Sequence, residues 1–388
     1  MKKSILFIIL LISFVSFSQE DHDISYGFES NSQYYLDDSK TGDFLESNRF
    51  RSNNFFKIDY SYKNFYAGLQ VESYEPKAML NYSPNLDKTN LGLYYLGYNT
   101  GKIEVTLGHF YEQFGSGLIL RSWEDRQLGI NNALLGGRFK YSPKEYLHFT
   151  SFYANQRKGF AISKGNIIGF NSDFDISSAL NFETSSLSAG FSYVGRSQEK
   201  TETNFDYNNR TDLFSSRIEF SKDHFYSNLE YVAKGKDAVI IQNQIKNAKK
   251  GLGINATFRR MENMNLFSDR EANGNIYNES VVNYLPALTK QHDYLLTNIY
   301  VYQAQPQVSF QDPSLIKSGE IGGQIDVFYK LKKGTFLGGK YGAKVALNFS
   351  SWHGLKADYD FAGFDYETDF FGFGQKYFSD LSFEVRKK

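Results

Sequence analysis

Hydrophobic and polar residues alternate with a period of two along much of the chain, which is typical of β-strands with one apolar and one polar face. The alternation is clearest in 335–350, where every second residue from Leu337 to Phe349 is apolar or glycine. The same pattern recurs in 56–62, 65–73, 103–111 and 319–330. Helical periodicity is nearly absent. The pattern predicts an all-β protein.

The links between these segments alternate between short and long. Short, turn-like links stand at 63–64, 99–102, 142–144, 185–186, 222–224 and 332–334. Longer polar links are expected at 75–88, 113–133, 197–210, 235–249, 262–291 and 351–375. Two strands, one tight turn and one longer loop form the hairpin unit of an outer-membrane barrel, whose short turns face the periplasm. We therefore predict a transmembrane antiparallel β-barrel of roughly 14–18 strands.

Two features favour a membrane barrel over a secreted soluble sandwich or propeller, which is the alternative for this pattern. Tyr and Phe crowd the apolar positions near strand ends, as interfacial girdles require. The polar faces carry full charges, which a water-filled lumen tolerates and a packed core does not. The residues expected to face the lumen are Lys57, Asp59, Glu72, Glu104, Asp326, Lys340 and Lys344.

Residues 113–133 break the strand pattern. Gly115-Ser116-Gly117 permits unusual backbone dihedrals, and a cluster of charges around Trp123 follows. Because the apolar residues of this stretch need cover from water, we expect it to fold into the lumen and narrow the pore. The expected constriction residues are Arg121, Glu124, Asp125, Arg126 and Arg138, with Arg138, Lys57, Asp59 and Glu72 as wall partners. The alternative is an external loop whose charges are solvated.

The N-terminus reads as an export signal. Lys2 and Lys3 precede an apolar run from Ile5 to Phe17, which is too short to span a bilayer as a helix. We expect removal of residues 1–18, leaving 19–388 as a single barrel domain with outer-membrane lipid as its surroundings. The chain ends at Val385-Arg386-Lys387-Lys388 rather than on an aromatic residue, which favours a C-terminally truncated fragment. Strand number and oligomeric state stay open.

Composition excludes several classes of function. The 388 residues include no cysteine, so the chain has no disulfide framework, thiolate zinc site or cysteine nucleophile. With 43 basic and 43 acidic side chains, it lacks the charge of a nucleic-acid binder. Its six histidines show no ligand spacing, and no catalytic or cofactor motif is present. An acidic cluster at 358–369 leaves calcium binding open as a minor alternative to a solvated loop.

Two segments carry a resemblance to a known family. The run Phe110–Arg126, FYEQFGSGLILRSWEDR, followed by Leu128–Asn132, resembles the signature of an uncharacterised family of exported Bacteroidetes proteins. Tyr284–His292, YLPALTKQH, resembles a second motif of that family. The resemblance implies an outer-membrane location and brings no activity, ligand or catalytic residue.

A porin-like channel or transporter for a small polar solute is therefore the leading function. The first alternative is a non-conducting barrel that binds a surface partner through the loops at 262–291 and 351–375. The second is a secreted soluble carbohydrate-binding protein or enzyme. In the leading interpretation, the protein is not an enzyme and binds no cofactor.

Overall fold

The computed structural model describes residues 22–40, 42, 48–199, 209–235, 238–270, 272, 279–289, 304, 318–363 and 365–387. The expected signal peptide, residues 1–18, lies outside these residues. The fold is all-β and is dominated by one antiparallel sheet of 16 strands. This count falls within the predicted range.

The sheet strands are β1 (His22–Tyr34), β2 (Phe50–Tyr62), β3 (Phe65–Ser73), β4 (Thr89–Asn99), β5 (Ile103–Phe110), β10 (Leu134–Lys144), β11 (Leu147–Lys158), β12 (Ala161–Asp175), β13 (Ser185–Ser197), β14 (Arg210–Lys222), β15 (Phe225–Lys234), β16 (Ala238–Lys249), β17 (Leu252–Glu262), β18 (Gly319–Leu331), β19 (Ala343–Asp360) and β20 (Asp365–Lys387). Two miniature hairpins lie between β5 and β10, made of β6 (Gln113–Phe114), β7 (Leu120–Arg121), β8 (Glu124–Asp125) and β9 (Ile130–Asn131). One short helix, α2 (Ile176–Leu180), links β12 to β13.

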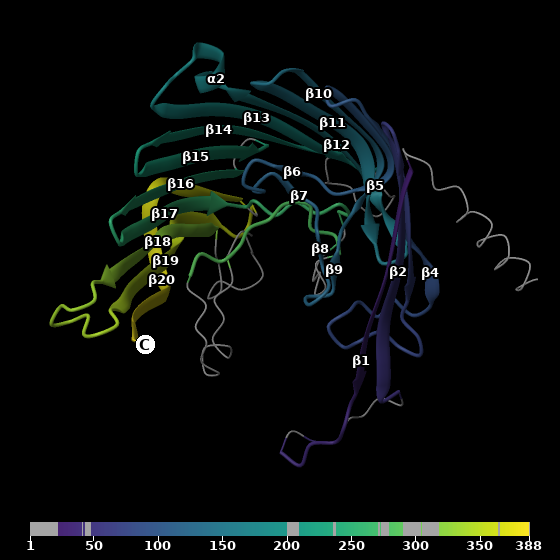
Figure 1. The fold of residues 1–388 in the computed structure, drawn as a ribbon, viewed down its shortest axis with the longest axis horizontal. Helices are drawn as coiled ribbons and strands as arrows, with labels where there is room; N and C mark the ends of the chain where they lie inside the picture. The colour runs from purple at the N-terminus through teal and green to yellow at the C-terminus, as the bar shows by residue number, and fades with distance from the viewer. Residues whose placement is uncertain are drawn as a thin grey trace, which may run out of the picture.

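The sheet curls into an arch with β1 and β20 at its two edges (Figure 1). Each strand pairs with its neighbours in chain order, except that β5 pairs directly with β10. At one end of the arch, which we call the turn end, β2–β3, β14–β15 and β16–β17 are joined by two-residue links. The long connections after β1, β3, β5, β13 and β17 lie at the opposite end, the loop end. The predicted alternation of short and long links is thus confirmed in part, because β11 and β12 are joined by a two-residue link at the loop end and β18 and β19 by a longer one at the turn end.

The two faces of the sheet are inverted relative to a soluble protein. On β14, Ser215 and Arg217 are buried on the concave face, while Phe214 on the convex face is 48% exposed. On β11, the convex Tyr153 is 58% exposed. Soluble domains usually bury their apolar residues and expose their charges. Here the buried concave face is rich in polar and charged groups, and the exposed convex face carries aromatic and aliphatic side chains.

One predicted strand is partly wrong. In 335–350, strand β19 begins only at Ala343, and 335–342 form a turn closed by a bridge between Thr335 and Gly339. Gly339 and Gly342 adopt positive φ values of 60° and 83°, which glycine allows and which bend the chain out of the sheet. These glycines interrupt the strand that the alternation predicts. Lys340 therefore lies exposed in this turn and not on the wall of the lumen.

Two predicted loops are also wrong, because polar sequences there form paired strands. Most of the supposed link 235–249 is β16, whose Ile240 is buried on the concave face. The supposed link 351–375 is formed largely by the long β19–β20 hairpin, in which Asp358 pairs with Glu367 and Tyr359 with Tyr366. The polar residues of these two segments belong to strands, although polar residues are also typical of loops. In a sheet with a polar concave face, polar residues at every second position are compatible with a strand.

Candidate functional site

Two segments that leave the sheet lie on its concave side (Figure 1). The first is 111–133, which contains the two miniature hairpins. The second comprises residues 263–270 and 279–289 of the β17–β18 connection. We call these two segments together the plug. The inward folding predicted for 113–133 is present in the structure, whereas the second segment was predicted only as a long loop, which the first alternative function assigned to a surface partner.

The plug is fixed to one wall by apolar packing. Phe114, Leu118, Ile119 and Leu120 are at most 2% exposed and belong to a single buried cluster. The wall residues of that cluster come from β5 and from the successive strands β10 to β17, and they are Phe110, Leu134, Phe152, Ala154, Ile167, Val194, Leu213, Val232, Ile240 and Met261. Met264, Leu266 and Val282 of the second segment complete the cluster. Burial of this size removes a large apolar area from water and stabilises the docked plug.

A polar contact lies beside this apolar cluster. The Ser116 backbone N–H and hydroxyl both donate to Glu230 Oε2, at 3.1 and 2.5 Å, and Ser215 donates to Oε1 at 2.9 Å. Glu230 is completely buried on β15. A Cβ atom on Gly115 would lie only 2.9 Å from Glu230 Oε1, and Gly115 has a φ of 55°. Glycine at this position allows the backbone to approach the carboxylate.

The two segments of the plug are joined to each other. Arg121 lies between the rings of Trp123 and Tyr284, with its guanidinium carbon 3.7 and 4.2 Å from the two ring centroids. The Arg121 N–H donates to the Val282 carbonyl at 2.9 Å, and the Tyr284 N–H donates to Gly117 at 2.9 Å. Cation–π contact and backbone pairing therefore bind the two segments into one unit.

Asn283 strengthens this joint. Its Nδ2 donates to the carbonyls of Leu118 and Met264, at 3.1 and 2.8 Å, and its Oδ1 accepts from the Leu266 N–H at 3.0 Å. The side chain is 2% exposed. One buried amide thus satisfies backbone groups from both segments, as burial of polar groups requires.

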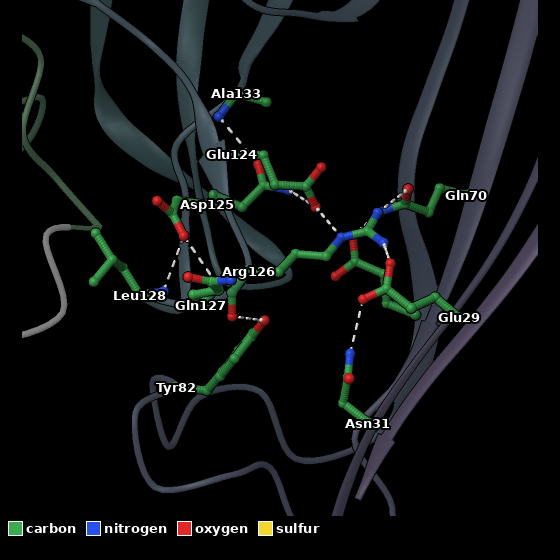
Figure 2. Close-up of polar contacts among 12 residues, drawn as sticks. Glu29, Asn31, Gln70, Tyr82, Glu124, Asp125, Arg126, Gln127, Leu128 and Ala133 are labelled. Atoms are coloured by element: carbon green, nitrogen blue, oxygen red, sulfur yellow. Dashed lines mark hydrogen bonds and ion pairs between the residues drawn. The ribbon is translucent and has the colours of Figure 1, made fainter. Parts of the chain in front are cut away.

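On the opposite side, Arg126 links the plug to the β1–β3 wall (Figure 2). Its guanidinium forms an ion pair with Glu29 of β1 and donates to Gln70 of β3 at 3.2 Å. Glu124 accepts from Arg126 Nε at 3.1 Å, and the guanidinium lies 4.1 Å from the ring centroid of Phe55. The Arg126 side chain is 27% exposed, so water reaches this contact. The ion pairs of Arg126 with Glu29 and Glu124 are therefore a partly solvent-accessible charged contact between the plug and the wall.

The backbone around Arg126 is held by hydrogen bonds with the side chains of Asp125 and Tyr82. Asp125 Oδ1 accepts from the N–H groups of Gln127 and Leu128, at 3.0 and 3.1 Å, which caps the turn and points this carboxylate away from the wall (Figure 2). Tyr82, from the β3–β4 connection, donates to the Arg126 carbonyl at 2.8 Å. Burial raises the pKa of Tyr82 to about 12, so this hydroxyl stays protonated at neutral pH.

Arg138 lies at the base of the plug, on the wall. It pairs with Glu104 at 2.5 Å and with Glu112 at 3.2 Å, and it donates to the Tyr111 carbonyl at 3.1 Å. Lys140 adds a second contact to Glu112 at 2.9 Å. The predicted constriction residues are thus divided. Arg138 holds the start of the plug, Arg121 its interior joint, and Arg126 and Glu124 its far edge.

The other predicted wall residues pair with residues of the wall itself. Glu72 forms a bidentate ion pair with Arg157 of β11, at 2.6 and 2.9 Å, and both side chains are almost completely buried. Lys57 pairs with Asp59 at 2.9 Å. The expected direct pairing of plug charges with Lys57, Asp59 and Glu72 is therefore not seen in the described part. Gln70 provides an indirect link, because it bonds both Glu72, at 2.9 Å, and Arg126.

The remaining residues predicted to face the lumen, Asp326 and Lys344, lie on β18 and β19. Asp326 accepts from Asn348 at 2.5 Å and from Gln324 at 2.9 Å, on the concave face of β18 and β19. Lys344 lies on the same face near the turn end. Sequence reasoning missed Glu29, Glu230 and Asn283, which contact the plug from distant parts of the chain.

Among the described residues, no group of three or more His, Asp or Glu side chains is arranged to hold a metal ion. The acidic residues at 358–369, considered above for calcium, lie mainly on β19 and β20. No helix in the described part is both long and apolar enough to cross a membrane.

The fold is similar to solved structures at low identity. Pseudomonas aeruginosa OpdL has 9% sequence identity, covers 94% of this chain and 93% of its own, and gives a TM-score of 0.44. Pseudomonas aeruginosa OccK5 (OpdH) has 11% identity with coverage of 90% and 84% and a TM-score of 0.43. A mutant of the Rh. blastica porin has 10% identity with coverage of 94% and 98% and a TM-score of 0.35. No activity is assigned from likenesses at this level.

Comparison of the sequence with known families identifies the family of this chain. No curated protein matches the chain. A model of a family of unknown function matches residues 1–388, the full length, and the chain therefore belongs to the DUF6029 family.

Proposed function

We propose that this protein is an outer-membrane β-barrel that passes a small polar solute through its lumen, beside the plug. The observation that carries the proposal is the inversion of the two faces of the sheet. Arg217 and Glu230 are buried on the concave face, while Phe214 and Tyr153 are exposed on the convex face. A broad apolar surface of this kind fits lipid and not water. A secreted soluble all-β protein would need some other cover for it.

Closure of the sheet is part of this proposal. In a bilayer every unpaired backbone N–H and C=O group costs several kcal/mol, so a sheet with two open edges is unfavourable there. With 16 strands in an antiparallel meander, β1 and β20 run in opposite directions and are able to pair with each other. We propose that they do so, in the outer membrane of the Bacteroidetes type that the sequence motifs suggest, after removal of residues 1–18.

Passage beside the plug is proposed at the Arg126 cluster. The apolar cluster packs the plug against the wall from β10 to β17, whereas Arg126, Glu124 and Glu29 on the other side are partly open to water. Charged side chains at a narrow point select solutes by charge and size. The chemistry needs no covalent step, and we propose no enzymatic activity.

The test combines fractionation with electrical recording. We expect the protein in the outer-membrane fraction, with a gel mobility that changes on boiling, and we expect steps of conductance in planar bilayers. Arg126→Ala should change the conductance or the ion preference of these steps. Recovery in the soluble fraction without a heat shift would contradict the barrel itself.

A second candidate function is a non-conducting binding or scaffold barrel. The dense hydrogen bonding of Asn283 and the Arg121 stack favour it, because they make the plug a rigid unit. A heat-modifiable membrane protein that never conducts, even as Arg126→Ala, would support this candidate over the channel.

A further inference from the structure

Three cationic side chains form a row across the last three strands, close to the turn end. Lys330 of β18 is directly opposite Lys344 of β19, which is directly opposite Arg386 of β20. All three are exposed. They lie far along the sheet from the plug and take no part in the site described above.

The row lies on the concave face. The pairing of β19 with β20 has no register shift between Ala343 and Trp352, so Lys344 points to the same side as Ser350. Ser350 hydrogen-bonds Thr289 of the plug at 3.1 Å, and the plug occupies the concave side. The three cations therefore face the interior of the arch.

Such a row is unfavourable without an anion. Like charges directly opposite each other on neighbouring strands destabilise a sheet. Glu384 pairs with Arg386, but within the described residues no ion pair involves Lys330 or Lys344. Two other concave lysines are compensated by carboxylates, Lys57 by Asp59 and Lys140 by Glu112.

The row also lines a pocket of about 320 Å³. Its lining includes three cations, Lys330, Lys344 and Arg386, against one carboxylate, Glu384. Phe328, which is 50% exposed, and Ala346 give the pocket an apolar side. A volume near the lower end of the range for small-molecule sites, with charge on one side and an aromatic ring on the other, suits a small organic anion.

We propose that this pocket binds a small organic anion, with a phosphate or carboxylate group on the Lys330–Lys344–Arg386 row and an apolar part against Phe328. Lysine ammonium groups and the arginine guanidinium donate charge-assisted hydrogen bonds to such oxygens. Binding at this pocket does not depend on whether the lumen conducts. A phospholipid headgroup and a free solute share this chemistry, and the experiment separates them.

The first experiment is calorimetric titration of the full chain, purified in a non-ionic detergent at low ionic strength, with phenyl phosphate. We expect saturable binding that is about tenfold weaker in Lys344→Gln and about a hundredfold weaker in the double variant Lys330→Gln, Lys344→Gln, since each lost contact of this strength is worth about a factor of ten. Phe328→Ala should weaken phenyl phosphate more than inorganic phosphate. The control is Lys57→Gln, which removes a concave lysine whose charge is already compensated.

The outcomes of this experiment distinguish binding in the pocket from a general effect of charge. Loss of affinity in the row variants, with Lys57→Gln unchanged, supports the pocket. Equal losses in all lysine variants would indicate a general field effect and overturn it, as would failure of both phenyl phosphate and phospholipid to bind. If native mass spectrometry finds a bound phospholipid that the double variant loses, the anion is a headgroup. Because removal of Lys344 relieves like-charge repulsion, the heat-shift temperature of these variants should not fall, which separates lost binding from lost folding.

Discussion

The two sides of the plug are held in different ways. On the β10–β17 side, Ile119 and its neighbours pack in a dry cluster, and Ser116 donates to the completely buried Glu230. On the β1–β3 side, Arg126 pairs with Glu29, whose side chain is 48% exposed and which belongs to the edge strand β1. The buried contacts are little affected by salt, while the exposed ion pair is screened by it. The first side therefore fixes the plug, and the second is the side on which we propose the passage to lie.

The largest effect is expected from the dry side. Ile119→Ala removes a completely buried side chain from the cluster. Such truncations cost about 2–5 kcal/mol, because apolar contacts are lost and a cavity remains. The heat-shift temperature on gels and the midpoint of urea unfolding should both fall clearly. Leu128→Ala is the matched control, because Leu128 is in the same segment and is 61% exposed. Equal destabilisation by the two variants would refute the packing asymmetry.

Glu230→Ala should give the next largest effect. The variant leaves the Ser116 N–H and hydroxyl, and the Ser215 hydroxyl, without their acceptor in a buried place. An unsatisfied buried group costs about 1–3 kcal/mol. Limited proteolysis at the Gly115–Gly117 turn, followed with time, measures release of this part of the plug. Glu219→Ala is the control, since Glu219 pairs with Asn228 on the same wall and away from the plug. Unchanged cleavage in Glu230→Ala would show that the apolar cluster alone holds the turn.

Arg121→Ala should have a smaller effect, on the joint inside the plug. It removes the cation between Trp123 and Tyr284 while leaving the backbone bonds of Arg121 and Tyr284 in place. A desolvated cation–π contact is worth about 2 kcal/mol, and an exposed one less than about 1. Arg121→Lys keeps the charge and loses the planar stack. We expect Trp123 fluorescence to change in both variants, with a smaller loss of stability in Arg121→Lys. Identical spectra in wild type and both variants would contradict the stack.

Much of the fold could be predicted because its signal is local. The period-two pattern in 56–73, 103–111 and 319–330 specifies strands without reference to distant residues, and β2, β3, β5 and β18 lie there. The pattern failed at 335–342 because Gly339 and Gly342, with positive φ values, bend this part of the chain into a turn. It failed again at β16, where Gln242, Gln244 and Lys246 are strand residues on the polar concave face.

The plug could be predicted only in part. Its apolar residues and the Gly115–Gly117 turn indicated that 113–133 needs cover, which is a property of the segment itself. Its partners are properties of the folded sheet. Glu29 is 97 residues from Arg126, and Glu230 is 114 residues from Ser116. Without the strand register, nothing in the sequence distinguishes these two carboxylates from the 43 acidic residues of the chain.

Arg126→Ala tests the difference between the two sides of the plug most directly, although its effect on stability should be the smallest. A partly exposed ion pair contributes about 0–1 kcal/mol, so the heat-shift temperature should barely change. The electrical effect should be larger, because the side chain sits where water reaches the plug and its charge acts on passing ions. High salt should reduce the difference in conductance between wild type and variant, as screening weakens that charge. Arg210→Ala, which removes an exposed pair with Asp212 away from the plug, is the control and should leave the traces unchanged. If Arg126→Ala destabilises the protein as strongly as Ile119→Ala and leaves conductance intact, the two sides of the plug are equivalent and the passage lies elsewhere.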